Sequence, residues 1–212
     1  MTRHLGYAPV LPRLAAGAAA VLVALTLSAC SGSQPSAARQ TTPTGSDVHD
    51  AADDVSFTLP RGWVNIPLQA GTEAALGKAL AGKGNPNDIL TQIERGQLRG
   101  LKAFALDPAR PANPTKLDFV VTNATGTTLD GLAKLLQLNF TQLSASNPKL
   151  VTVTMPAGQM LRADYGLPDG QATTQYYLIA RQHAYELTFT APSKDRAEPA
   201  AYDAVARSLR VG

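Results

Sequence analysis

The sequence predicts an α+β fold, in which an antiparallel β-sheet of about six to seven strands is flanked by helices. Two observations predict this class. Stretches in which apolar and polar residues alternate, as in half-buried strands, recur through residues 55–192. Segments with apolar residues at helical spacing lie among them, in the order strand, two helices, two strands, helix, four strands, helix. Because short turn signals separate the last four strands, we expect these strands to form an antiparallel meander.

The folded part is expected to begin with a strand at residues 55–59, where apolar residues alternate with polar ones. Pro60 and Gly62 end this strand, since both residue types interrupt regular structure. Two short helices are predicted next, at residues 72–81 and 87–98, because their apolar residues recur on one helical face.

The middle of the chain predicts a hairpin and then a long helix. Residues 101–107 and 116–124 resemble strands, and the prolines of "PARPANP" between them exclude regular structure, so the hairpin has a long tip. Residues 129–143 repeat leucine at helical spacing, with Thr128 as the N-cap. Such a leucine stripe usually packs on a core, so we expect this helix to cover the sheet; the alternative is a face that contacts a membrane or a partner.

The last part of the chain predicts the meander and a closing helix. Its four strands are expected at residues 149–156, 159–167, 173–181 and 185–192. A helix at residues 198–210 follows, with Pro199 in its first turn and arginines near its end, which suits the helix dipole. No internal repeat or second-domain boundary interrupts this pattern.

The first 29 residues have the three parts of a secretory signal peptide. Arg3 and Arg13 supply positive charge, residues 14–29 are apolar, and small residues precede Cys30. The apolar stretch is shorter than the roughly 20 residues that a transmembrane helix needs. We therefore expect residues 1–29 to be a signal peptide that is removed.

The single cysteine, Cys30, ends the stretch "LSAC", which resembles the bacterial lipobox of Leu, a small residue, Ala or Gly, and Cys. The resemblance implies that the Cys30 thiol carries a diacylglycerol and that two or three acyl chains hold the protein on a membrane. The alternative is an incidental cysteine after an ordinary signal peptide. Residues 30–54 predict a flexible tether, because Ser, Thr, Gly, Pro and Gln predominate. One globular domain is expected over residues 55–212.

Within the predicted tether, "HDAADD" at residues 49–54 gathers one imidazole and three carboxylates. Carboxylate oxygens suit Ca²⁺ or Mg²⁺, but the spacing matches no calcium-binding loop. We expect a solvated acidic linker, with a divalent-cation site as the alternative.

Charge and motif content argue against several functions. Two of the 19 cationic residues, Arg3 and Arg13, precede the apolar run, so the mature chain has 17 cations against 16 anions and no basic block for nucleic acid. The sequence contains no GxSxG, P-loop, SxxK or HExxH motif. The one histidine of the predicted domain, His183, lies in a predicted turn. We therefore predict no catalytic, cofactor-binding or metal-binding residue.

The meander predicts which side chains share a face. If residues 182–183 form the last turn, Tyr177 and Glu186 lie on one face of the sheet and an apolar surface lies on the other. A four-residue turn at residues 168–171 then adds two charged residues of the preceding strand to the polar face. The predicted ligand face consists of Arg162, Asp164, Gln175, Tyr177 and Glu186. The alternative is a charged network that lies under a helix or faces water.

Several stretches together resemble the actinobacterial LpqN-type lipoproteins, which are similar in architecture to the PsbP-like α/β/α sandwich. They are the lipobox, the tether, "VSFTLPRGW", "NFTQL", "QYYLIARQHAYELTFTAP" and "YDAVARSL". The resemblance implies a cell-envelope lipoprotein without an established enzymatic mechanism, linked in some members to envelope biogenesis or lipid-related transport. It supplies no catalytic motif.

These observations predict a lipoprotein anchored to the cell membrane through Cys30 and facing the extracytoplasmic side. We expect it to bind an envelope protein or an amphiphile without catalysis, and we expect neither a cofactor nor a nucleic-acid partner. Two alternatives stay open: a carrier of lipid or another small ligand, and a hydrolase that uses Asp164 or Glu186.

Overall fold

The computed structural model describes residues 45–68, 72–80, 100–109 and 111–212. All of these residues belong to one compact unit, Arg39–Gly212. The predicted signal peptide, Cys30 and the helix predicted at residues 87–98 lie outside the described residues. In the part of the chain that is described, no helix is long and apolar enough to cross a membrane.

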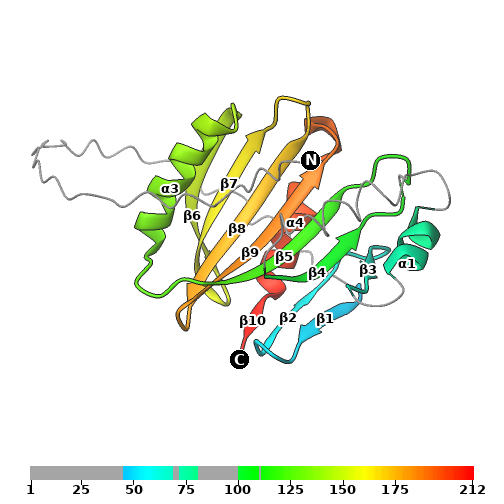
Figure 1. Cartoon of the computed structure of the whole chain (residues 1–212), viewed down its shortest axis with the longest axis horizontal. Coiled ribbons are helices and arrows are strands. Elements are labelled where there is room, and N and C mark those ends of the chain that lie inside the picture. Colours follow the sequence, from blue (N-terminus) through cyan, green and yellow to red (C-terminus); the bar gives the residue numbers. More distant parts are fainter. Residues whose placement is uncertain (1–44, 69–71, 81–99, 110) are drawn as a thin grey trace, which may run out of the picture. The chain divides into compact units, whose positions relative to one another are not determined.

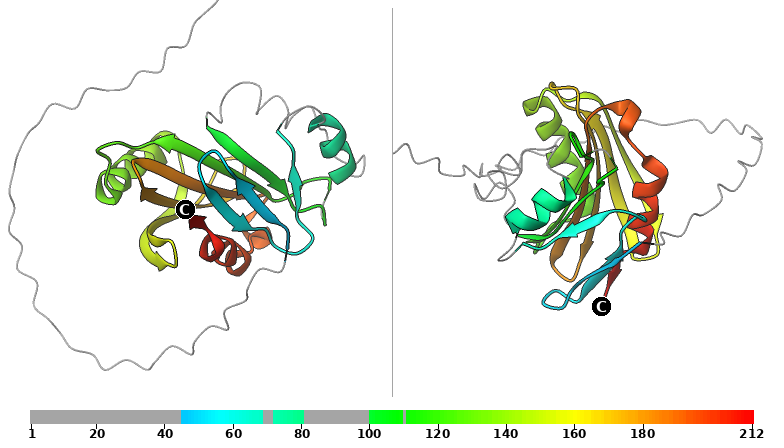
Figure 2. Two further views of the ribbon diagram at one scale, coloured as in Figure 1. Left: turned by 90° about the horizontal axis from the view of Figure 1, so that it is seen from below. Right: turned by 90° about the vertical axis from the view of Figure 1, so that its right-hand side faces the viewer.

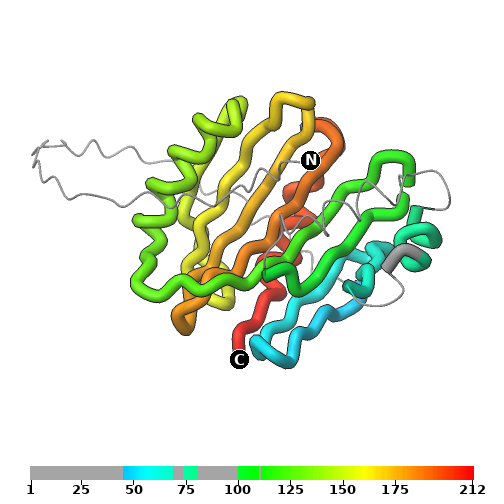
Figure 3. Tube along the Cα trace, in the orientation of Figure 1, coloured from blue at the N-terminus to red at the C-terminus, as the bar shows by residue number. Residues whose placement is uncertain are grey.

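A seven-stranded antiparallel sheet organises the fold (Figure 1). Its strand order is β3-β4-β5-β9-β8-β7-β6. The strands are β3 (Val64–Ile66), β4 (Leu101–Leu106), β5 (Lys116–Asn123), β6 (Ser146–Met155), β7 (Gly158–Gly166), β8 (Ala172–Ala180) and β9 (His183–Ala191). The tube in Figure 3 shows the predicted meander of β6 to β9, and β5 beside β9 although they are far apart in the sequence.

A second, three-stranded sheet has the order β1-β2-β10. Its strands are β1 (Asp47–Asp50), β2 (Val55–Thr58) and β10 (Arg210–Val211). Residues 47–54 are therefore a strand and a turn, and assigning them to the flexible tether was wrong. The sequence does not signal β1 because only one of its four residues, Val48, is buried.

Helices lie on both faces of the large sheet (Figure 2). On one face, α1 (Thr72–Ala79) packs on β3 and β4, and α3 (Leu129–Gln142) packs on β7 and β8. On the other face lie α4 (Pro199–Ser208), preceded by the 3-10 helix η1 (Lys194–Arg196), and the three-stranded sheet. The predicted N-cap of α3 is confirmed, since the Thr128 hydroxyl accepts a 3.1 Å hydrogen bond from the Gly131 amide.

The main hydrophobic core lies between the large sheet and the layer formed by α4, β1 and β2. The ring of Phe189 on β9 stacks on that of Tyr202 on α4, with centroids 4.3 Å apart and an interplanar angle of 11°. Two smaller clusters lie under α1 and α3. The closing helix ends at Ser208 rather than Arg210, because Arg210 and Val211 pair with β2. The predicted α+β class is confirmed.

Candidate functional site

The five residues of the predicted ligand face do not share one face of the sheet. Arg162 and Asp164 on β7 project toward α4, whereas the other three, on β8 and β9, project toward the α3 side. The reason is register: Arg162 lies opposite Tyr176 and not opposite Tyr177. The prediction of a single shared face is therefore wrong.

The error comes from the loop between β7 and β8. Gly166 pairs with Ala172, so the loop contains five residues, 167–171, rather than the predicted four. A change of one residue exchanges the two faces of a strand. The β8–β9 turn also differs from the prediction, because Arg181 and Gln182 form it with φ values of 51° and 65°. The pair that closes the turn is Ala180 with His183 instead of Arg181 with Ala184. Because the turn moves by one residue on both strands, the residues of β8 and β9 keep the faces that were predicted.

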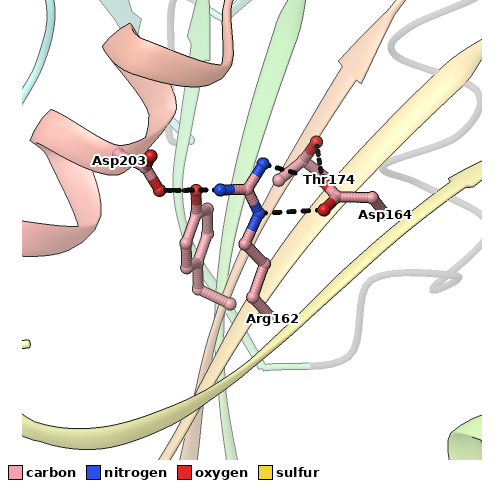
Figure 4. A network of polar contacts seen from close by, with 5 residues as sticks. Arg162, Asp164, Thr174 and Asp203 are labelled. Carbon is pink, nitrogen blue, oxygen red and sulfur yellow. Dashed lines mark hydrogen bonds and ion pairs between the residues drawn. The ribbon is translucent and has the colours of Figure 1, made fainter. Parts of the chain in front are cut away.

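On the α4 side, five residues form a network that we call the α4 clamp: Arg162, Asp164, Thr174, Tyr176 and Asp203 (Figure 4). Two guanidinium nitrogens of Arg162 donate to the two oxygens of Asp164, at 2.9 and 3.1 Å. A third nitrogen donates to Oδ1 of Asp203 on α4, at 3.1 Å. The clamp therefore joins β7 to α4 through one guanidinium.

The remaining clamp contacts complete the hydrogen bonding of both carboxylates. The Tyr176 hydroxyl donates to Oδ1 of Asp203 at 2.5 Å, and the Thr174 hydroxyl donates to Oδ1 of Asp164 at 2.8 Å. Burial and this bond to Asp203 raise the pKa of Tyr176, so the hydroxyl stays a donor. One cation lies between two anions, and each charge has a bonded partner. The α4 clamp is a structural connection between sheet and helix.

On the α3 side, a second polar group lies on β5, β9 and β8, between the clusters under α1 and α3. We call it the polar strip, and it consists of Asp118, Gln175, Tyr177, Glu186 and Thr188. Three donors reach Oε1 of Glu186: the Thr188 hydroxyl at 2.7 Å, the Gln175 amide at 2.9 Å and the Tyr177 hydroxyl at 3.3 Å. Burial raises the pKa of Glu186, and these three hydrogen bonds oppose that rise.

Like Thr188, Asp118 is a member of the polar strip that the predicted ligand face did not include. It lies on β5 opposite Thr188, while its neighbours Leu117 and Phe119 point into the main core. Its Oδ1 atom is buried and has no hydrogen-bond partner among the described residues. Burial raises the pKa of Asp118 to about 6, with Lys116 opposing and Glu186 adding to the rise. The alternation in "KLDFVV" indicates its face, but the pairing of β5 with β9 is not visible in the sequence.

The other groups singled out from the sequence do not form a reactive site. His183 is the first residue of β9, so placing it in the turn was wrong, and its Nδ1 is 3.0 Å from the carbonyl oxygen of Arg181. The acidic residues of "HDAADD" lie at the β1–β2 turn, where the Lys102 amine is 2.5 Å from Asp53 and 3.7 Å from Asp50. They are part of the fold and not a solvated linker. Across the described ranges, no group of three His, Cys, Asp or Glu side chains is arranged to hold a metal ion.

The polar strip is therefore the candidate binding site. Carboxylates whose pKa is raised by burial and by a neighbouring charge are candidates for functional sites. The strip offers carboxylate acceptors and neutral donors, and its members include neither a thiol nor an imidazole. Its chemistry suits recognition of a donor-rich group.

Comparison with known proteins gives structural neighbours only. No protein-family profile matches the chain, and no curated protein matches it. A solution structure of the PsbP-type protein CyanoP from Synechocystis is similar at 13% identity and a TM-score of 0.49, covering 84% of this chain and 98% of that one. A Bacteroides thetaiotaomicron protein has 13% identity and a TM-score of 0.45, with coverages of 79% and 48%. LpqN of Mycobacterium tuberculosis, described as involved in cell envelope biogenesis, has 12% identity and a TM-score of 0.40, with coverages of 79% and 85%. The resemblance to LpqN-type lipoproteins stays a prediction.

Proposed function

We propose that this protein is a non-catalytic accessory protein of the cell envelope, held on the extracytoplasmic face of the membrane by a lipid on Cys30. In this proposal the polar strip binds a partner or ligand. The observation that carries the binding role is Oδ1 of Asp118, which lies near the hydrogen-bonded Glu186 and receives no donor from the residues that the structure describes. A buried acceptor without a donor is costly unless a bound group supplies one.

A binding role agrees better with the polar strip than hydrolysis does. The alternative hydrolase requires Asp164 or Glu186 to act on a substrate. Asp164 is bonded to Arg162 and Thr174 in the α4 clamp, and Glu186 accepts three donors on one oxygen. The strip and the clamp point to opposite sides of the sheet, so their carboxylates do not form a pair on one substrate.

The anchor can be tested directly by metabolic labelling with a fatty-acid analogue. We expect the wild-type chain to be labelled and to sediment with membranes, and Cys30→Ala to lose the label, because the thiol is the attachment point. Ser31→Ala is the matched control and should keep the label. Persistent labelling of Cys30→Ala would show that the lipobox interpretation is wrong.

The binding surface can be tested by photo-crosslinking in intact cells. Thr190 is the next residue after Thr188 on the same face of β9. A photoreactive amino acid at this position should give a discrete crosslinked product. The same amino acid at Thr152, exposed on the edge strand β6, is the control and should not give that product. Equal products from both positions, or none from Thr190 under several activation conditions, would contradict the proposal.

A further inference from the structure

The carboxylates of the polar strip have acceptor capacity that the described residues leave unused. All three donors to Glu186 converge on Oε1, and among the described residues no donor reaches its Oε2. Oδ1 of Asp118 is buried, and no donor from the described part of the chain reaches it. Each of these two carboxylates on one sheet face therefore has an oxygen without a donor among the described residues, while the neighbouring neutral side chains fix the orientation of Glu186.

These two carboxylates lie close enough to contact one ligand. Asp118 pairs directly with Thr188, and Glu186 is the next residue of β9 on the same face. Diagonal neighbours of this kind on adjacent antiparallel strands have Cα atoms about 7–8 Å apart, and their side chains can meet. A group with donors on two sides can therefore reach both carboxylates.

The charge of the strip indicates the chemistry of that group. The charge of Glu186 contributes to the raised pKa of Asp118, and the one described cation on this part of the face, Lys116, forms no ion pair with either carboxylate among the described residues. On the opposite face, two aspartates are satisfied by the guanidinium of Arg162. The strip also has two carboxylates, but no cation of the described residues is bonded to them.

We propose that Asp118 and Glu186 form a binding site for a guanidinium group of a ligand or partner. This inference rests on the proposed binding role of the polar strip and names what the strip binds. A guanidinium presents N–H donors on several sides in one plane and pairs with carboxylates in bidentate fashion, which suits two acceptors on adjacent strands. A divalent cation suits the site less, because Ca²⁺ takes six to eight oxygen ligands and only two carboxylates lie here.

The test is calorimetric titration of the full-length chain in a neutral detergent. The probes are butylguanidinium and its neutral counterpart butylurea, which has a similar shape but no charge. We expect butylguanidinium to bind and butylurea not to bind. Asp118→Asn and Glu186→Gln should each weaken binding at least about tenfold, because one charged acceptor of the pair is lost. Asp130→Asn, an exposed carboxylate in the first turn of α3, is the matched control and should bind as the wild type does.

A second pair of probes distinguishes the source of the guanidinium. A short peptide containing arginine is compared with the same peptide containing citrulline. Binding of the arginine peptide alone would support an arginine side chain of a polypeptide partner, and binding of butylguanidinium as well would support recognition of the free group. Thermal unfolding of each variant, monitored by circular dichroism, tests whether the substitutions preserve the fold.

Three results would overturn the inference: no binding of either guanidinium probe, binding that both carboxylate variants retain, or Ca²⁺ binding that both variants lose while the guanidinium probes do not bind. Failure here is separable from failure of the proposed function. A specific crosslink from Thr190 without guanidinium binding would keep the accessory role and reject this ligand. The lipid-labelling result is independent of both.

Discussion

Each face of the large sheet carries a polar group, and the two groups differ in whether their charges are paired. On the α4 face, Arg162 lies between Asp164 and Asp203, and every charge has a bonded partner. On the α3 face, Asp118 and Glu186 are two carboxylates on adjacent strands, and no described cation is bonded to either. Both groups are half-buried, so burial alone does not distinguish them.

The difference teaches how to separate a structural network from a candidate site in the same fold. A closed network stabilises the contact it makes, and removing its central charge leaves partners unpaired. An open pair of carboxylates costs stability in the free protein, because desolvation opposes ionisation and no bonded cation compensates. The two groups should therefore respond to mutation with opposite signs.

The largest effect is expected from Arg162→Met in the α4 clamp. The substitution removes the bonds to both Asp164 and Asp203 and leaves two carboxylates close together, so the free energy of unfolding should fall by about 3 kcal/mol. Urea denaturation at pH 7 measures this change. The control is Arg207→Met, an exposed cation of α4, which should change stability by less than about 0.5 kcal/mol. Similar losses in both variants would mean that the clamp contributes no more than a surface charge.

A smaller change of opposite sign is expected from Asp118→Asn. The rise of the Asp118 pKa from 3.8 to about 6 corresponds to about 3 kcal/mol of destabilisation at neutral pH. Because the side chain keeps some contact with water, we expect Asp118→Asn to raise the free energy of unfolding at pH 7 by about 2 kcal/mol.

The pH dependence of stability supplies the control for this prediction. Between the unfolded and folded pKa values of Asp118, 3.8 and about 6, the folded chain binds more protons than the unfolded chain, so the contribution of this group to stability falls as the pH rises. Asp118→Asn should remove that contribution. A gain in stability that is the same at pH 4 and at pH 7 would contradict the assignment of the raised pKa to Asp118.

The smallest effects come from two neighbouring tyrosines that point to opposite faces. Tyr176→Phe removes a 2.5 Å bond to Asp203 and should cost about 1 to 1.5 kcal/mol. Tyr177→Phe removes a 3.3 Å bond to Glu186 and should cost less than about 0.5 kcal/mol. Chemical denaturation of the two variants under the same conditions compares the faces directly. The reverse order would mean that the polar strip, not the clamp, is the tighter network.

Local patterns in the sequence predicted much of the fold. The long helix with its Thr128 cap, the hairpin of β4 and β5, and the β6–β9 meander each follow from periodicity and turn signals within a few residues. Strand β1 was missed because only Val48 is buried in it, so its residues do not show the alternation of a half-buried strand. The pairing of β5 with β9 joins distant segments and has no local signal.

The candidate site was predicted only in part for the same reason. Tyr177 and Glu186 were placed correctly on one face, because an error of one residue on both strands leaves the faces unchanged. Arg162 was placed on the wrong face by the single extra residue of the β7–β8 loop. Asp118 could be included only with knowledge of the β5–β9 pairing. Register and distant pairing, not residue type, limited the prediction.

The edge position of β1 has a mechanical consequence. β1 is the outer strand of its sheet, whereas β2 is held by β10 and by a 2.9 Å bond from its Thr58 amide to the Ser208 hydroxyl of α4. A pull on the chain before Asp47 would load β1 first, against its pairing with β2, the burial of Val48 and the contact of Asp50 with Lys102. Each residue released would add about 3.3 Å of reach. β1 would then act as an extensible segment that yields under tension before the domain unfolds.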